Sequence, residues 1–402
     1  MKILWLKNNL LHPLDTGGKI RTYNMLRTIR ERHEIHYIAF ADPRKDAEAM
    51  RLALEYCRRL WTVDPPRVPD KGSAAYYWNI LWTLGDSRPF TSVSYRSRSV
   101  QELLSRLAVE ERYDVLIADF LTMCINIPEK LPFPVVHFSH NVESMLWQRY
   151  VATERNPLQR IVFERERQRV ERFEKNVINS YALTIAVSEA DCEHFRTVYG
   201  GSRVGFVTTG VDTEYYAPGS SREEPGSIAF LGSMDWMPNI DAVTYFIQSI
   251  YPSVRRAVPE ATFLIVGRSP TDAVRALAAH DPSIVVTGTL DDTRNCLAKA
   301  ACAVVPIRVG GGTRIKIYEL MAMGKAIIST TIGAEGLQYS NGDDIIIEDD
   351  PARFAQTLVK ILRDDALRAR IGKSARAHVE THCSWKAVGE RFMSLLSTVK
   401  ER

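Results

Sequence analysis

The sequence lacks a long hydrophobic segment, since no apolar run approaches the roughly 20 residues that a membrane-spanning helix needs. We also expect no secretory leader, because residues 1–7 are apolar for only four residues before Lys7 and instead predict a first β-strand. The composition is not that of a disordered chain, with 45% hydrophobic and 25% charged residues. We therefore expect a cytoplasmic protein, and a peripheral contact with the inner face of the membrane stays open.

Cysteines and spaced aspartates are scarce. The chain has 6 cysteines among 402 residues. No two of them are separated by just two residues, the spacing that is typical of zinc and redox sites. We expect reduced thiols in a cytosolic protein. No Asp-x-Asp triplet occurs, because the aspartates at 291–292, 343–344, 349–350 and 364–365 are adjacent pairs. The sequence therefore predicts no metal site.

The charge of the chain is unevenly distributed. There are 52 Lys and Arg residues against 48 Asp and Glu. Residues 1–212 hold 30 basic against 26 acidic side chains, whereas residues 213–402 hold 22 of each. A basic first half suits an anionic acceptor or an anionic membrane surface. A plain solubilising surface is the alternative, and nucleic acid is not an expected partner.

Short apolar runs alternate with longer helical patterns, which is typical of βα units around parallel sheets. Continuous apolar runs without strict alternation predict buried parallel strands. In the first half we expect strands at residues 3–6, 35–40, 115–119, 135–138 and 183–187. In the second half we expect them at residues 228–231, 262–266, 284–287, 303–306, 326–329 and 344–347. The pattern predicts an α/β protein with two doubly wound, Rossmann-like sheets.

A linker is predicted between the two series of strands. Residues 215–226 read YYAPGSSREEPG and are rich in Pro, Gly, Ser and charge. We place the first domain at residues 1–212, the second at 225–385, and a C-terminal helix at 386–402 that crosses back to the first domain. Two such domains facing a cleft would present to it the carboxyl ends of both sheets, where open α/β folds bind ligands.

The strongest local signal is a glycine-rich stretch at residues 304–319, which read VVPIRVGGGTRIKIYE. After a strand that ends at Pro306, Gly311 and Gly312 lead through Thr313 into a helix. Glycines let a backbone pass close to a ligand, and the free amides and dipole of a helix start favour an anion. The pattern predicts an anion-binding loop.

Two cations follow this loop. Arg314 and Lys316 add positive charge to the first turn of the helix, where cations are disfavoured unless an anion is bound. A diphosphate would resolve that conflict. Glu319 lies three residues beyond Lys316, near the same face, with acceptor oxygens suited to a ribose diol. The alternative is a glycine-rich turn with both cations in solvent.

Two features of the first half indicate a second site. Residues 16–21 read TGGKIR after the first strand, so Gly18 lies either in a phosphate-facing or acceptor-facing loop or in a simple turn. His137 and His140 lie at the end of the strand 135–138. His140 begins the following loop, where active sites of α/β folds lie, so we favour it over His137. A structural histidine is the alternative.

Two further segments have open interpretations. Residues 76–84 read YYWNILWTL, an aromatic-rich run that fits an interfacial membrane patch, an acceptor-binding face or core packing. Residues 155–175 are predicted to form a highly charged helix, supported by intrahelical pairs, and a solvated helix is the favoured interpretation. Neither segment is assigned to the catalytic site.

Along nearly its whole length the sequence resembles glycosyltransferase family 4. That family carries two glutamates separated by seven residues at this strand–loop–helix. Glu319, which is followed by LMAMG, matches the second glutamate. Gly311 stands in place of the first. Residues 228–239 (IAFLGSMDWMPN) resemble the start of the family's donor domain, closest to a branch linked to exopolysaccharide and lipid-linked sugar assembly. Four further stretches resemble strand ends of the family and follow one another in the family's order, at residues 186–189, 209–212, 264–268 and 286–290.

The resemblance implies a retaining GT-B glycosyltransferase of polysaccharide or glycolipid biosynthesis, and the missing Asp-x-Asp predicts metal independence. No cofactor is implied; the donor is a UDP- or GDP-linked sugar and the acceptor a saccharide or lipid-linked molecule. Glu319 would hold the ribose, Arg314 and Lys316 the diphosphate, and His140 the transferred sugar or the acceptor. The predicted catalytic residues are His140, Arg314 and Lys316, and the predicted donor-binding residues are Gly18, Gly232, Arg268, Leu290, Gly311, Gly312, Thr313, Arg314, Lys316 and Glu319.

Two alternatives stay open. A GT-B nucleotide-sugar epimerase would need several acid–base groups, which the motifs match poorly. A non-catalytic nucleotide-sugar-binding protein gains weight from Gly311, because the replaced glutamate helps to position the transferred sugar in the family.

Overall fold

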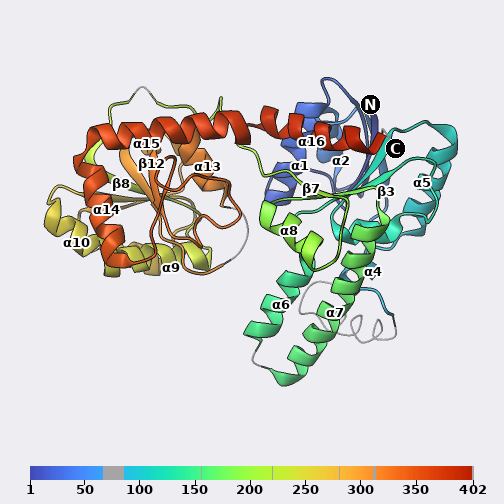
Figure 1. Ribbon diagram of the computed structural model, residues 1–402, viewed down its shortest axis with the longest axis horizontal. Helices are drawn as coiled ribbons and strands as arrows, with labels where there is room; N and C mark the ends of the chain where they lie inside the picture. The colour runs from blue at the N-terminus through green and yellow to red at the C-terminus, as the bar shows by residue number, and fades with distance from the viewer. Residues whose placement is uncertain (67–85, 155, 220, 280, 311–313, 401–402) are drawn as a thin grey trace. The chain divides into compact units, whose positions relative to one another are not determined.

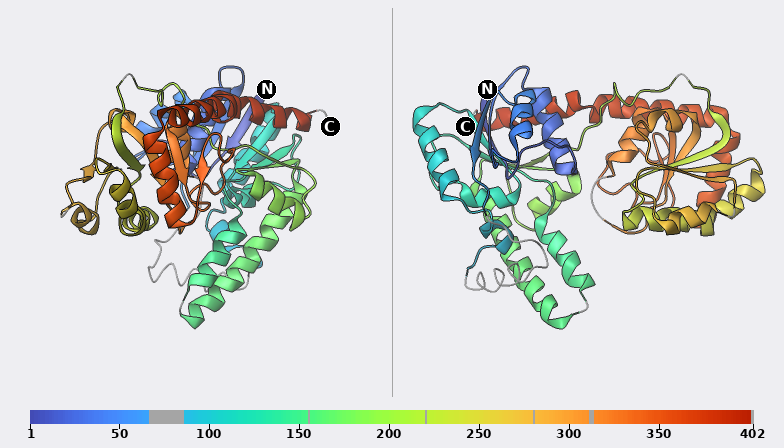
Figure 2. Two further views of the ribbon diagram at one scale, coloured as in Figure 1. Left: turned by 60° about the vertical axis from the view of Figure 1, so that its left-hand side comes forward. Right: turned by 180° about the vertical axis from the view of Figure 1, so that it is seen from behind.

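The computed structural model describes residues 1–66, 86–154, 156–219, 221–279, 281–310 and 314–400. The aromatic run at residues 76–84 and the loop residues Gly311, Gly312 and Thr313 lie outside this part of the chain. The chain divides into two compact units, Met1–Thr208 with Gly389–Arg402, and Thr209–Val388. Each unit is built around its own parallel sheet (Figures 1 and 2). The predicted α/β architecture with two doubly wound sheets is therefore confirmed.

In the first unit the described residues form a seven-stranded parallel sheet with the order β3-β2-β1-β4-β5-β6-β7. Its strands are β1 (Lys2–Leu6), β2 (Glu34–Phe40), β3 (Arg59–Val63), β4 (Val115–Asp119), β5 (Val135–Phe138), β6 (Leu183–Ala186) and β7 (Val204–Phe206). β1 pairs with both β2 and β4, so the strand order reverses between β1 and β4. Ligands of open α/β folds bind at such a reversal, beyond the carboxyl ends of the strands.

The described helices of this unit are α1 (Gly17–Ile29), α2 (Ala47–Leu52), α4 (Phe90–Val93), α5 (Arg98–Glu110), α6 (Glu143–Thr153), α7 (Pro157–Ser180) and α8 (Glu189–Thr197), with 3-10 turns at Ala53–Glu55 and Leu121–Asn126. α6 and α7 pack as a hairpin that extends away from the sheet (Figures 1 and 2). The charged helix predicted at residues 155–175 is solvated in part. Its second half buries Glu166, Arg169, Val170 and Glu174, because the base of the hairpin packs on the unit.

In the second unit the described residues form a six-stranded parallel sheet with the order β10-β9-β8-β11-β12-β13. Its strands are β8 (Glu224–Leu231), β9 (Thr262–Val266), β10 (Ile284–Gly288), β11 (Ala300–Val305), β12 (Ala326–Ser329) and β13 (Ile346–Ile347). β8 pairs with β9 on one side and β11 on the other, so this sheet reverses between β8 and β11. The second reversal point therefore lies beyond Leu231 and Val305.

The described helices of the second unit are α9 (Met237–Tyr245), α10 (Tyr251–Ala257), α11 (Asp272–Ala278), α12 (Arg294–Lys299), α13 (Ile315–Ala322), α14 (Pro351–Arg363) and α15 (Asp365–His378), with π-helical turns at Phe246–Ile250 and Val379–Cys383. α15 covers one face of the sheet and α9 the other (Figure 1). Phe230, Phe246, Phe263 and Phe354 are fully buried in one continuous apolar cluster. Burial of about 25 cal/mol for each Å² of apolar surface makes this core the main stabilising term.

The last helix, α16 (Trp385–Lys400), begins in the second unit and ends in the first. Phe392 packs between the rings of Trp5 on β1 and Phe138 on β5, with centroid distances of 5.8 and 5.5 Å. Gly389 lies so close to α1 that a Cβ there would stand 2.6 Å from the Thr28 methyl carbon. The core of the first unit therefore includes residues from the end of the chain.

The predicted strands differ from the structure in a few places. β3 (RLWTV) and β7 (VGF) were not predicted, because one mixes polar residues with apolar ones and the other is very short. β8 begins at Glu224, inside the predicted linker, because Glu224 pairs with Ala300 of β11. For the same reason β11 begins three residues before the predicted strand 303–306. Asp344 lies before β13 and accepts a hydrogen bond from the Ser340 amide instead.

Candidate functional site

The loop between β8 and α9 and the start of α13 meet at the reversal point of the second sheet. The Lys316 ammonium donates to the side-chain oxygen of Asn239 at 2.7 Å and lies 4.5 Å above the ring of Phe230. Asn239 in turn donates to the carbonyl of Ser233 at 2.8 Å, which fixes the loop after β8. Burial, and then the neighbouring charge of Arg314, lower the pKa of Lys316 to about 7. A bound anion would relieve both effects.

Two glycines allow this close packing: Gly232, which was predicted as a donor-binding residue, and Gly267, which lies against it. A Cβ on Gly232 would stand 2.7 Å from the Lys316 ammonium and 2.6 Å from the amide nitrogen of Asn239. A Cβ on Gly267, at the end of β9, would stand 1.8 Å from the carbonyl oxygen of Gly232. Both positions therefore require glycine, and Lys316 is held against the backbone of the β8 loop.

Arg314 stands directly before α13 and is buried, with 4% of its surface exposed. Its guanidinium lies 5.2 Å from the ring of Trp236, an aromatic residue of the β8 loop. Gly310 has φ 104° and lies against Pro238, where a Cβ would stand 2.9 Å from the proline ring. The described part of this loop therefore folds over the β8 loop and carries Arg314 to the same place as Lys316.

Glu319 lies on the same helix and is half-buried. Burial raises the pKa of its carboxyl, while a hydrogen bond from Tyr216 and the charge of Lys316 act in the opposite direction. Tyr216 belongs to the segment predicted as a linker, and nothing in the sequence pattern indicated its role. Lys316 and Glu319 thus lie three residues apart on α13, and Tyr216 contacts Glu319 from the preceding segment.

The remaining predicted donor residues of this unit lie at the same edge of the sheet. Arg268, two residues beyond β9, donates from its Nε to the Ser233 hydroxyl at 3.1 Å. It therefore joins the β8 loop next to Gly232. Leu290 lies two residues beyond β10 and is 37% exposed. The structure thus brings Gly232, Arg268 and Lys316 together around the β8 loop, whereas Leu290 lies by the edge strand.

The reversal point of the first sheet holds a buried polar network centred on Asp119, the last residue of β4. Asp119 is fully buried and receives four contacts, at 2.9 Å from Trp5 Nε1, 2.9 Å from Lys7 Nζ, 2.8 Å from Thr22 Oγ1 and 2.6 Å from His140 Nε2. Burial alone would raise the pKa of Asp119, but Lys7 and His140 together hold it below its ordinary value. Asp119 is therefore an ionised carboxylate that fixes its neighbours.

His140, directly after β5, is oriented by this network. Burial lowers the pKa of its imidazole to about 3, an effect that Asp119 only partly offsets. The ring stacks on Phe120, with centroids 3.9 Å apart and planes 9° from parallel. Phe120 has φ 77°, a strained value for a residue with a side chain, and a Cβ on Gly18 would stand 2.9 Å from its ring. Gly18 thus lies against the Phe120–His140 pair.

His137 lies elsewhere, in the interior of β5. It is buried, neither ring nitrogen has a hydrogen-bond partner within the described chain, and burial lowers its pKa to about 4. Its ring is therefore a neutral part of the core. Asp119, Lys7 and Thr22 were not predicted as site residues, although Lys7 and Asp119 are the charged residues at the ends of two predicted strands.

Across the described ranges, no three His, Cys, Asp or Glu side chains are grouped as a metal site requires. In the same part of the chain, no helix has both the length and the apolar character needed to cross a membrane.

Two doubly wound sheets, each with polar residues at its reversal point, define a GT-B fold. The solved structure of HepE from Anabaena in complex with UDP has this fold and matches with a TM-score of 0.65. The match covers 99% of this chain and 100% of HepE, at 15% sequence identity. The family model for "Glycosyltransferase Family 4" matches residues 16–215, and that for "Glycosyl transferases group 1" matches residues 225–364. The chain belongs to glycosyltransferase family 4.

Two curated relatives come from corynebacteria. The GDP-mannose-dependent monoacylated alpha-(1-6)-phosphatidylinositol monomannoside mannosyltransferase of Corynebacterium glutamicum is 27% identical over 232 residues, or 53% of this chain and 61% of that protein. The D-inositol 3-phosphate glycosyltransferase of Corynebacterium efficiens is 24% identical over 293 residues, or 66% of this chain and 65% of that protein. The chain thus spans less than two thirds of the length of either relative.

Proposed function

We propose that this protein is a retaining glycosyltransferase that moves a sugar from a UDP- or GDP-linked donor to a saccharide or lipid-linked acceptor, in polysaccharide or glycolipid biosynthesis. The observation that carries the proposal is the grouping of Arg314, Lys316 and Glu319 at the reversal point of the second sheet. The printed names of the relatives support it, since one uses GDP-mannose and HepE was solved with UDP.

The cations suit a diphosphate. Lys316 has a pKa lowered to about 7, with Arg314 as the second cause after burial. Two cations placed close together at the start of a helix are stabilised when a doubly charged group binds between them. Negative charge builds on the diphosphate as its bond to the sugar breaks, so the same two side chains would stabilise the departing nucleotide.

Glu319 suits the ribose. A half-buried carboxylate that already accepts a hydrogen bond from Tyr216 has further lone pairs for the two hydroxyls of a diol. Along α13, Lys316 would then contact the diphosphate and Glu319 the ribose of the same ligand. This arrangement matches the order of groups in a nucleoside diphosphate.

His140 would contact the transferred sugar or the acceptor. Burial keeps its ring neutral, and the hydrogen bond to Asp119 holds it in one orientation, which favours hydrogen bonding over proton transfer. Gly18 lies beside this ring, so we assign it to the same sugar or acceptor contact.

Thermal-shift measurements with UDP, GDP, their sugar conjugates and the free nucleosides test the proposal. A ligand that binds only the folded state at about 100 times its Kd adds roughly 2.7 kcal/mol of stability, so the correct base is readily found. Release of UDP or GDP from the binding donor is then followed with candidate acceptors. A chain that none of these nucleotides stabilises would contradict the proposed function.

A non-catalytic nucleotide-sugar-binding protein is a second candidate, favoured by Gly311 in place of the family glutamate. Tight donor binding without release of nucleotide in the presence of any acceptor would support it. Conversion of the donor to another nucleotide sugar without an acceptor would instead indicate an epimerase.

A further inference from the structure

The end of the α6–α7 hairpin carries large apolar side chains that no core covers. Tyr150, Leu158 and Ile161 are 51%, 73% and 66% exposed, and they fall within twelve consecutive residues around the connection between the two helices. The hairpin extends from the first unit with this connection at its tip (Figures 1 and 2). Grouped apolar side chains on a surface indicate an interaction site, whereas single ones do not.

The start of α7 fixes two of these side chains. The Asn156 side chain accepts hydrogen bonds from the amides of Leu158 and Gln159 at 3.0 and 3.4 Å, and Pro157 occupies the first turn of the helix. A capped helix start with proline in its first turn is well ordered. Leu158 and Ile161 are three residues apart, so they lie on the same face of α7.

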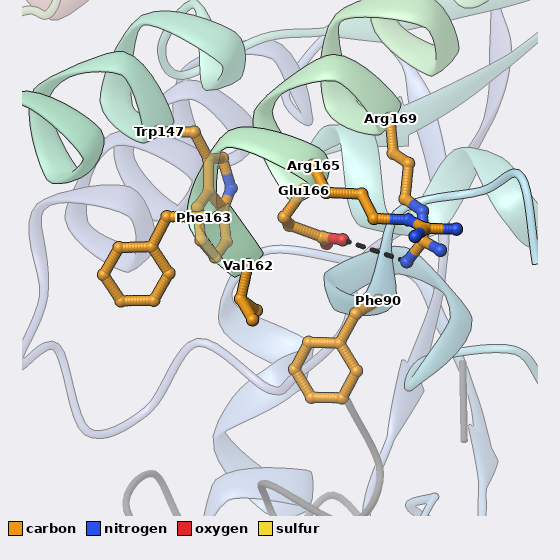
Figure 3. A pocket seen from close by; sticks show the side chains of 7 residues that line it. All are labelled: Phe90, Trp147, Val162, Phe163, Arg165, Glu166 and Arg169. Atoms are coloured by element: carbon orange, nitrogen blue, oxygen red, sulfur yellow. Dashed lines mark ion pairs between the residues drawn. The ribbon is translucent and has the colours of Figure 1, made fainter. Parts of the chain in front are cut away.

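An aromatic cluster continues the apolar surface along the hairpin. Trp147 lies 5.6 Å from Tyr150 and 5.7 Å from Phe163 between ring centroids. Trp147 and Phe163 also line a pocket together with Phe90 and Val162 (Figure 3). Its polar lining residues are Arg165, Arg169 and Glu166, which is buried and paired with Arg169 at 3.7 Å. The exposed tip thus adjoins an apolar hollow lined by aromatic rings.

The polar residues around the tip are biased toward positive charge. Arg149, Arg160 and Arg165 are exposed there. The acidic residues between Arg149 and Arg165 are Glu154 and Glu164, and Glu164 pairs with Arg167 at 2.7 Å. Apolar side chains flanked by arginines complement a surface that is apolar beneath and anionic on top.

We infer that the tip of the α6–α7 hairpin docks on a membrane that contains anionic phospholipid. Tyr150, Leu158 and Ile161 enter the interface between headgroups and acyl chains, and the flanking arginines bind headgroup phosphates. Such docking is peripheral. It goes beyond sugar transfer and does not depend on the identity of donor or acceptor.

Cosedimentation of the full chain with vesicles tests the docking surface. Vesicles of phosphatidylcholine alone are compared with vesicles of phosphatidylcholine and phosphatidylglycerol. The double substitution Leu158→Ser and Ile161→Ser should lower binding to the anionic vesicles by at least about tenfold, because two exposed apolar side chains no longer enter the interface. The matched control, Leu54→Ser with Val109→Ser, removes two exposed apolar residues (60% and 88%) from other parts of the same unit and should bind like the wild type.

A second pair of variants tests the charge. Arg160→Gln should lower binding to anionic vesicles by roughly fivefold and leave the weak binding to neutral vesicles unchanged. Arg98→Gln on α5, whose side chain is 90% exposed, is the matched control and should have no effect. Raising the salt concentration should weaken the anionic preference of the wild type and of the control, and somewhat less that of Arg160→Gln, which keeps Arg149 and Arg165.

Two outcomes would overturn the inference. One is vesicle binding of the double variant that equals that of the wild type. The other is a wild type that does not bind vesicles but forms a dimer, when the double variant stays monomeric. The tip would then be a contact between two copies of this chain. Thermal unfolding of each variant, with and without the nucleotide that stabilises the wild type, confirms that the fold and the donor site are intact.

Discussion

The Nε2 atom of His140 lies 2.6 Å from Oδ1 of Asp119. An ionised carboxylate can only accept, so Nε2 carries the ring proton and Nδ1 is left as an acceptor. Burial lowers the pKa of this imidazole to about 3, which keeps it neutral across the physiological range. His140 is therefore set up to receive a hydrogen bond from a hydroxyl group.

His140→Ala should lower turnover by about tenfold to a hundredfold, which corresponds to one lost hydrogen bond of about 1.5–3 kcal/mol. Nucleotide affinity should stay nearly unchanged, because the proposed nucleotide contacts belong to the other compact unit. Turnover assays and calorimetry on the same preparation measure both quantities. The exposed His382→Ala is the control, and an equal loss of nucleotide affinity in His140→Ala would rule out its assignment to the sugar or acceptor.

Lys316→Met should weaken nucleoside diphosphate binding by about ten- to a hundredfold and nucleoside binding little, because only the diphosphate meets the ammonium. Calorimetry with nucleoside, monophosphate and diphosphate gives the comparison. Lys299→Met removes an exposed lysine of the same unit and should change none of the three. Equal losses for nucleoside and diphosphate would mean that Lys316 does not bind the phosphates.

Glu319→Ala should weaken the binding of nucleoside and diphosphate by the same factor, since both ligands carry the ribose. One lost charge-assisted hydrogen bond predicts about tenfold or more. Glu260→Ala, at an exposed position of the same unit, is the control. A loss confined to the diphosphate would show that Glu319 acts through Lys316 and not on the ribose.

Sugar transfer should survive chelation by EDTA. The chain has no Asp-x-Asp triplet, and the proposed diphosphate contacts are side-chain cations. Initial rates before and after dialysis against EDTA measure this. A rate that disappears and returns on addition of Mn²⁺ or Mg²⁺ would disprove metal independence.

Glu143→Gln should raise stability at alkaline pH. The Glu143 amide donates to the Glu174 carboxylate at 2.8 Å, and burial raises the pKa of each carboxyl to about 7, with the charge of Glu143 adding to the effect on Glu174. Between the ordinary pKa of 4.5 and about 7 the folded state binds more protons than the unfolded state, so stability falls as the pH rises.

Urea unfolding at pH 5 and pH 8 measures this effect. Glu143→Gln should be more stable than the wild type by about 1–3 kcal/mol at pH 8, and the difference should be much smaller at pH 5, where both carboxyls are protonated in the folded state. The exposed Glu102→Gln should show no such dependence. A constant difference at both pH values would mean that burial does not raise the pKa of Glu143.

Sequence patterns predicted what is local. The buried strands of both sheets follow from their apolar runs, and the grouping of Arg314, Lys316 and Glu319 follows from helical spacing on α13. The Asp119 network did not follow, because Lys7 and Asp119 are 112 residues apart and meet only through the pairing of β1 with β4. Tyr216 was read as part of a linker, because a composition rich in Pro and Gly says nothing of what a single side chain contacts.

The placement of Phe392 has a consequence for synthesis on the ribosome. Most of the N-terminal unit emerges first. The ring of Phe392, which packs on Trp5 and Phe138, is added about 250 residues after Phe138. Until Phe392 is synthesised, the rings of Trp5 on β1 and Phe138 on β5 lack this apolar packing partner. The first unit therefore completes its core only after the whole second unit has been synthesised.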